Sequence, residues 1–123
     1  MAIPNILSGS TIAAGGTIIT IPANSYWEGH INLSGAVIVA SGAAAQSAHA
    51  RVSVVGANSV PPAGTYLRVD LHAPASALAA VGTHDSKTHS TPFAVSTGAN
   101  SVDLVLNSSN TTAQSASAVG EVR

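Results

Sequence analysis

The sequence predicts an all-β protein, an antiparallel β-sandwich of the jelly-roll or immunoglobulin-like type with at most one short helix. Three segments carry this prediction, because apolar and polar residues alternate along 26–34, 65–72 and 101–107. A period of two is typical of a strand with one buried face. Gly, Pro and Asn residues separate such segments at intervals of roughly 8–12 residues, which favours a sandwich or barrel over an α/β fold.

The N-terminal half is expected to hold four strands. The first is a β-branched run that Pro22 ends, and such residues pack well on a pleated surface. In the second, Trp27, Ile31 and Leu33 share one face, and Gly35 is expected to end the strand. The expected strands of this half cover 17–21, 26–34, 36–40 and 48–55.

The C-terminal half combines strands with one candidate helix and one polar loop. Leu67, Val69 and Leu71 should face the core from the strand that follows the Pro61–Gly64 turn. The Ala-rich segment 75–81 follows Pro74 and is either a short helix or an irregular loop. The expected strands of this half cover 65–72, 93–97 and 101–107, and the polar loop covers 82–91.

The length of 123 residues predicts a single domain. One β-sandwich should therefore span residues 1–123. Residues 1–9 and the Ser/Ala/Thr-rich tail 111–123 are expected to form terminal arms or edge strands, and the small side chains of the tail suit pairing with a neighbouring subunit.

Charge is scarce, since only 7% of the residues are charged and the net charge is −1. An ordinary soluble domain has about 25%. We expect no nucleic-acid partner, because the basic residues are too dispersed in sequence to predict a basic patch. Weak charge repulsion favours self-association, so a homo-oligomer is expected, with a trimer as the specific prediction. The basic residues are Arg51, Arg68, Lys87 and Arg123.

No arrangement of residues predicts catalysis. The chain has no cysteine, no Gly-x-Ser-x-Gly motif and no Gly-rich phosphate-binding motif. His84, Asp85 and His89 share the polar loop, but their spacing matches no compact zinc site. The remaining histidines fall on polar strand faces. We therefore expect no enzyme activity, no catalytic residue, no cofactor and no metal.

Aromatic residues make up only 3% of the chain and are its candidate interface anchors. Aromatic side chains dominate the energetics of protein interfaces. Trp27 fits either a core position or an interface. The candidates are Tyr26, Trp27, Tyr66 and Phe93.

Two stretches carry a resemblance to known proteins. The sequence PAGTY, which ends at Tyr66, resembles the tyrosine corner of immunoglobulin-like sandwiches. The segment Ser8–Gly42 is similar in style to small β-rich virion proteins of tailed bacteriophages, in its Gly-terminated lead, its TIPA strand end and its aromatic-started alternating strand.

The second resemblance implies a virion structural protein, with capsid decoration ahead of a minor tail role. Its partners would be copies of itself and the major capsid protein or another virion protein. No signal peptide or membrane span is apparent, so synthesis in the host cytoplasm and location in the virion are expected. The alternative is a receptor- or glycan-binding module of a phage tail or cell surface, with His84, Asp85 and His89 as its ligand loop.

Overall fold

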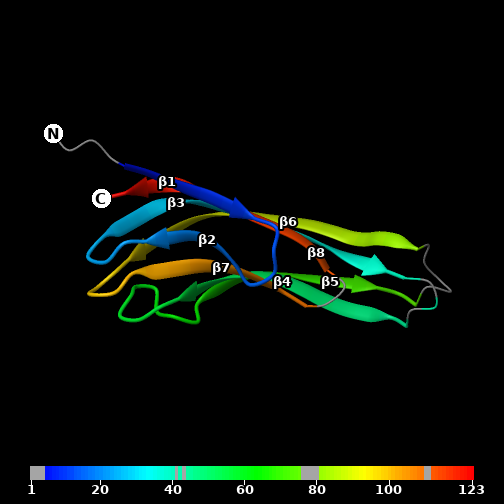
Figure 1. Ribbon diagram of the computed structural model, residues 1–123. Helices are drawn as coiled ribbons and strands as arrows, with labels where there is room; N and C mark the ends of the chain where they lie inside the picture. Colours follow the sequence, from blue (N-terminus) through cyan, green and yellow to red (C-terminus); the bar gives the residue numbers. More distant parts are fainter. Residues whose placement is uncertain (1–4, 41, 43, 76–80, 110–111) are drawn as a thin grey trace.

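The computed structural model describes residues 5–40, 42, 44–75, 81–109 and 112–123 (Figure 1). These residues form eight strands and no helix, which confirms the all-β prediction. The strands are β1 (Asn5–Thr11), β2 (Gly16–Ile21), β3 (Tyr26–Val39), β4 (Gln46–Val55), β5 (Tyr66–Ala73), β6 (Gly82–Ser96), β7 (Val102–Ser108) and β8 (Thr112–Val122).

The strands build two four-stranded antiparallel sheets with the order of a jelly roll. Sheet A runs β1-β8-β3-β6 and sheet B runs β2-β7-β4-β5. Thus β1 pairs with β8, β2 with β7, β3 with β6 and β4 with β5, as in one long hairpin rolled into a sandwich. The first and last strands, β1 and β8, consequently lie side by side, with Asn5 opposite Val122.

The immunoglobulin-like alternative is wrong, because that fold pairs the strands in a different order. Tyr66 stands at the start of β5, as predicted, but its side chain is half exposed on the outer face of sheet B. It therefore does not serve as the corner of an immunoglobulin-like sandwich.

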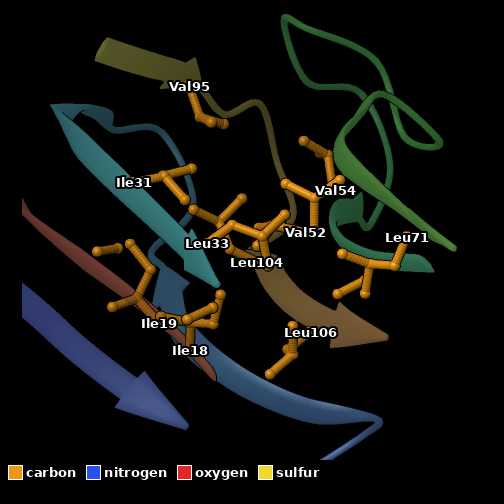
Figure 2. Close-up of a cluster of buried hydrophobic side chains, with 14 of the residues drawn as sticks. Ile18, Ile19, Ile31, Leu33, Val52, Val54, Leu71, Val95, Leu104 and Leu106 are labelled. Carbon is orange, nitrogen blue, oxygen red and sulfur yellow. The ribbon is translucent and has the colours of Figure 1, made fainter. Parts of the chain in front are cut away.

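The inner faces of the two sheets enclose one hydrophobic core (Figure 2). Val69 and Leu71 are buried in it, and Leu67 packs against its rim, so the predicted inner face of β5 is confirmed. The alternation in the sequence identified these faces because inward and outward side chains alternate along a strand. The largest fully buried side chains are Trp27, Ile21, Ile31, Leu33, Leu104 and Leu106.

Strand β3 continues through Gly35, so the expected break there is wrong. Gly35 lies on the inner face, where an added Cβ would sit 3.2 Å from Leu71 Cδ1 and 3.3 Å from Val69 Cγ2. The glycine leaves room for the side chains of sheet B and does not form a turn.

The segment expected as a polar loop is a strand, β6. It pairs with β3 along its length, but as an edge strand it is exposed at most positions from Gly82 to Ser90. Its polar sequence therefore reflects the solvent exposure of an edge strand and does not mark a turn. Pro92 lies inside β6, where an edge strand tolerates the lost backbone donor.

The ends of the chain differ from each other. Strand β1 is an edge of sheet A, as expected, whereas β8 lies between β1 and β3. Ala116 and Ala118 of β8 are buried in the core. The expectation that 111–123 forms an arm or edge strand is therefore wrong for 112–122, because the small side chains fit a crowded central strand.

The segment 75–81, expected to be a short helix or an irregular loop, falls largely on residues 76–80, which lie outside the described residues. Among the residues that are described, no helix is long and apolar enough to cross a membrane.

Candidate functional surfaces

Trp27 is a core residue, the first of the two positions that the sequence left open for it. Its side chain is fully buried, and its indole Nε1 donates a hydrogen bond to the backbone oxygen of Leu7 at 3.0 Å. The ring lies against Gly29 and Gly120, which are register partners on β3 and β8. A Cβ on Gly120 would stand 2.7 Å from Trp27 Cε2 and Cζ2. The two glycines therefore leave the space that the indole ring of Trp27 occupies.

The other aromatic candidates lie at three different places. Tyr26 is half buried on the outer face of sheet A, and its hydroxyl donates to Glu28 Oε2 at 3.0 Å. That hydrogen bond raises the pKa of Tyr26, and the Arg123 guanidinium lies 4.9 Å from the ring centre. Phe93 is half buried against the core. Tyr66, at 50% exposure, is the aromatic candidate most open to a ligand or partner.

The outer face of sheet A presents a field of small uncharged polar side chains, here named the serine face. Register aligns Ser10, Ser117, Asn32 and Ser90 in one row across all four strands. The Ser34 and Thr88 hydroxyls are 3.3 Å apart in the next row. The serine face consists of Ser8, Ser10, Asn32, Ser34, Thr88, Ser90, Ser115 and Ser117.

Two exposed apolar residues adjoin the serine face. Val119 lies between Ser8 and His30 in the register and is 59% exposed. Ile6, on the edge strand β1, is 79% exposed. A hollow of about 330 Å³ lies between Ser10, Asn32 and Ser115. This side of the molecule is thus broad and partly apolar, and its carboxylates, Glu28 and Glu121, lie opposite each other beyond Val119, outside the serine face.

Asp85 and Lys87 join the edges of the two sheets. Asp85 Oδ2 accepts a hydrogen bond from the backbone N–H of His72 at 2.7 Å, and Lys87 Nζ donates to the backbone oxygen of Asp70 at 2.7 Å. Lys87 Nζ also lies 3.5 Å from Asp85 Oδ2. Side chains of β6 therefore satisfy edge groups of β5, a way of blocking unwanted strand pairing.

Backbone irregularity gives Asp85 its position. The register between β3 and β6 shifts between Gly35 and Val37, and Asp85 has a φ of 54°. A bulge of this kind re-aims a side chain, and Asp tolerates the left-handed region better than most residues. The backbone N–H of His72 lowers the pKa of Asp85, and Lys87 adds to that effect.

The expected ligand loop of His84, Asp85 and His89 is therefore not a loop. His84 and His89 stand five positions apart on a strand, a separation of roughly 15 Å. Asp85 is held by the backbone of β5. These three residues do not converge on one site.

The histidines also lie apart from one another. His30 is on the outer face of sheet A, whereas His49 and His72 are on the outer face of sheet B. Within the described part of the chain, no three His, Cys, Asp or Glu residues gather as metal ligands. The expectation of no metal stays a prediction.

A hollow on the outer face of sheet B is the feature that sequence reasoning missed. It has a volume of about 490 Å³ and lies beside the loop between β4 and β5. Arg51, Tyr66 and Asn107 line it, from three neighbouring strands. Arg51 lies directly opposite Arg68 in the register, so the basic residues are less dispersed than the sequence indicated. Only strand pairing reveals this cluster.

A scan against protein-family models and searches of curated proteins and of solved structures found no match for this chain.

Proposed function

We propose that this protein is a non-enzymatic structural subunit of a virion, one that decorates and stabilises a capsid as a homotrimer. The observation that carries the proposal is the jelly-roll strand order in a chain with only 7% charged residues. Viral capsid domains make wide use of this fold. Likeness of fold alone does not assign a function, so the surface must also suit the role.

The serine face supplies that second argument. It spans all four strands of sheet A and carries no charged side chain. Uncharged hydroxyls are cheaper to remove from water than ions, and Ile6 and Val119 add exposed apolar area beside them. We propose this face as the surface that docks on the major capsid protein, with subunit association adding further buried area.

A receptor- or glycan-binding module is the second candidate, because lectin domains also use jelly rolls. The hollow beside Tyr66 and Arg51 favours it, since one half-exposed aromatic ring there lies beside polar groups. The loop first expected to hold the ligand contributes nothing to this argument.

The test of the structural role is location. Antibodies raised against the purified chain are applied to virions in immunogold electron microscopy, and regular labelling of the capsid shell is expected. Labelling confined to the tail tip would favour the receptor-binding candidate. Particles without label would contradict the proposal.

Oligomeric state is a separate measurement. Light scattering at micromolar concentration should give three times the monomer mass of 12.1 kDa. A monomer that still labels the shell would contradict the solution trimer and leave decoration standing.

A further inference from the structure

Arg51 is a cation that has no acidic partner among the described residues. It stands directly opposite Arg68 on β5, and like charges in that position repel. Arg68 is compensated, because its Nε lies 2.6 Å from Asp70 Oδ1. Arg51 is instead placed over the Tyr66 ring, 5.7 Å from its centre. Among the described residues, its buried Nε has no hydrogen-bond acceptor.

An unpartnered buried donor of this kind destabilises the fold, and more so when the group is charged. A ligand acceptor that meets the planar guanidinium with two oxygens, as a carboxylate does, would neutralise the charge of Arg51. Arg51 thus has the chemistry of an anion receptor that nothing else in the described chain uses.

The hollow around Arg51 is large enough for a ligand that is bigger than a single carboxylate group. Its volume of about 490 Å³ falls in the range of small-molecule sites. Asn107 lies opposite Arg51 on β7, and Ser53 lies opposite Tyr66 on β4, so the hollow is lined by an amide and a hydroxyl as well as the guanidinium. Val55, Gly56 and Gly64 complete the wall. The lining combines one cation, neutral hydrogen-bonding groups and an aromatic ring.

The pKa of His49 reflects the positive potential around Arg51. It lies two residues before Arg51 on the same face of β4. Burial lowers the pKa of His49, and the nearby Arg68 and Arg51 lower it further. The Asp70 carboxylate, opposite His49, opposes this effect without cancelling it.

We propose that the hollow lined by Arg51, Tyr66 and Asn107 binds an acidic monosaccharide unit, a sugar ring that bears a carboxylate. The carboxylate pairs with the Arg51 guanidinium. The ring hydroxyls bond Asn107 and Ser53, and the apolar ring face lies along Tyr66. This proposal names the ligand class of the hollow that supports the glycan-binding candidate, and it does not depend on the structural role, because the hollow is on sheet B and the serine face is on sheet A.

The experiment is an NMR titration of the ¹⁵N-labelled protein with three probes: glucuronate, glucose and acetate. Glucuronate should shift the amide signals of residues around the hollow, from Arg51 to Gly56 and from Gly64 to Tyr66. Glucose and acetate should each bind at least about tenfold more weakly, because each lacks one half of the recognised group.

Variants assign the binding to the guanidinium. Arg51→Gln should weaken glucuronate binding by about tenfold or more, the effect of losing a charge-assisted hydrogen bond. Arg123→Gln is the matched control, because the Arg123 guanidinium also lies over a tyrosine ring, that of Tyr26, but the residue directly follows β8 of the other sheet. It should leave the affinity unchanged. The dispersed spectrum of each variant verifies that it is folded.

A second readout follows His49. A bound carboxylate should neutralise Arg51 and raise the pKa of His49, measured from its ring proton shifts. Absence of any glucuronate-induced shift, or equal affinity in Arg51→Gln, would overturn the proposal. Equal binding of acetate and glucuronate would overturn the sugar part. Loss of glucuronate binding leaves capsid labelling unaffected, so the two proposals fail independently.

Discussion

The inner faces of the two sheets are alike, because both form the hydrophobic core, whereas their outer faces differ. Inside, both contribute aliphatic side chains to one core. Outside, sheet A carries the uncharged serine face, whereas sheet B carries Arg51, Arg68 and Asp70 around a hollow. Sheet A is also the sheet that packs its one tryptophan on a pair of glycines.

This difference indicates that the two outer faces suit two different kinds of contact. A flat field of small hydroxyl groups suits a broad contact whose energy is spread over many residues. A hollow with one unpartnered guanidinium suits a compact ligand that supplies the missing charge. Because the core fixes only the inner half of each strand, the outer halves are free to diverge in this way.

The largest expected effect concerns the inner face of sheet B. Leu71→Ala should lower the free energy of unfolding by about 2–5 kcal/mol, because Leu71 is 3% exposed and fills the space above Gly35 of sheet A. Leu67→Ala should cost less, since Leu67 lies at the rim of the core. Urea denaturation followed by circular dichroism measures both. Equal losses would mean that the two sheets pack differently along β5.

The next prediction concerns the inner face of sheet A, where a substitution adds a methyl group instead of removing side-chain atoms. Gly120→Ala should lower the free energy of unfolding by about 1–3 kcal/mol, the usual cost of overpacking. The new Cβ would press on the backbone oxygen of Glu28 and would lie 2.7 Å from the Trp27 ring, so only the part of the loss that comes from the ring should depend on Trp27. Trp27→Phe removes the ring atoms concerned, so a double-mutant cycle between the two changes should give a favourable coupling energy. Strict additivity would show that the indole does not rest on Gly120.

A smaller effect is expected where the edges of the sheets meet. Asp85→Asn retains a side chain that tolerates the left-handed backbone but removes the charge next to Lys87 and the His72 N–H. Because the pKa of Asp85 is lowered in the folded protein, its charge stabilises the fold at neutral pH. That contribution disappears as the pH falls through the folded-state pKa.

Thermal unfolding across acid pH measures this effect. The melting temperature of Asp85→Asn should lie below that of the wild type at pH 7, and the gap should close as the pH approaches the lowered pKa. A gap that is unchanged at low pH would mean that the charge of Asp85 does not stabilise the joined edges.

The smallest effect on stability is expected for a substitution that tests which sheet docks on the capsid. Ser117→Lys places a charge in the middle of the serine face and should change the free energy of unfolding by no more than about 0.5 kcal/mol. It should nevertheless abolish attachment to the capsid, because the ammonium group would have to be desolvated. Ser47→Lys, on the outer face of sheet B, is the control.

Co-sedimentation of each variant with its virion shell measures attachment. Ser117→Lys should stay in the supernatant while Ser47→Lys sediments with the particles. The reverse result would transfer the docking surface from sheet A to sheet B.

The sequence by itself determined where most strands lie and which way they face. The alternation at 26–34, 65–72 and 101–107 predicted inner faces that the structure confirms, because inward and outward exposure leaves a local signal with a period of two. The same signal gave a correct fold class. It failed for β6, which is an edge strand with little cover, and for β8, whose alanines and serines resemble a tail.

Only the tertiary structure decided which strands are neighbours. Pairing of β4 with β5 and β7 brings Arg51 beside Arg68 and Asn107, and pairing of β8 with β1 and β3 assembles the serine face. These contacts join residues far apart along the chain, and no local pattern encodes them. The register is fixed instead by the burial of the whole inner face, because a slip of one residue would turn every core side chain toward water.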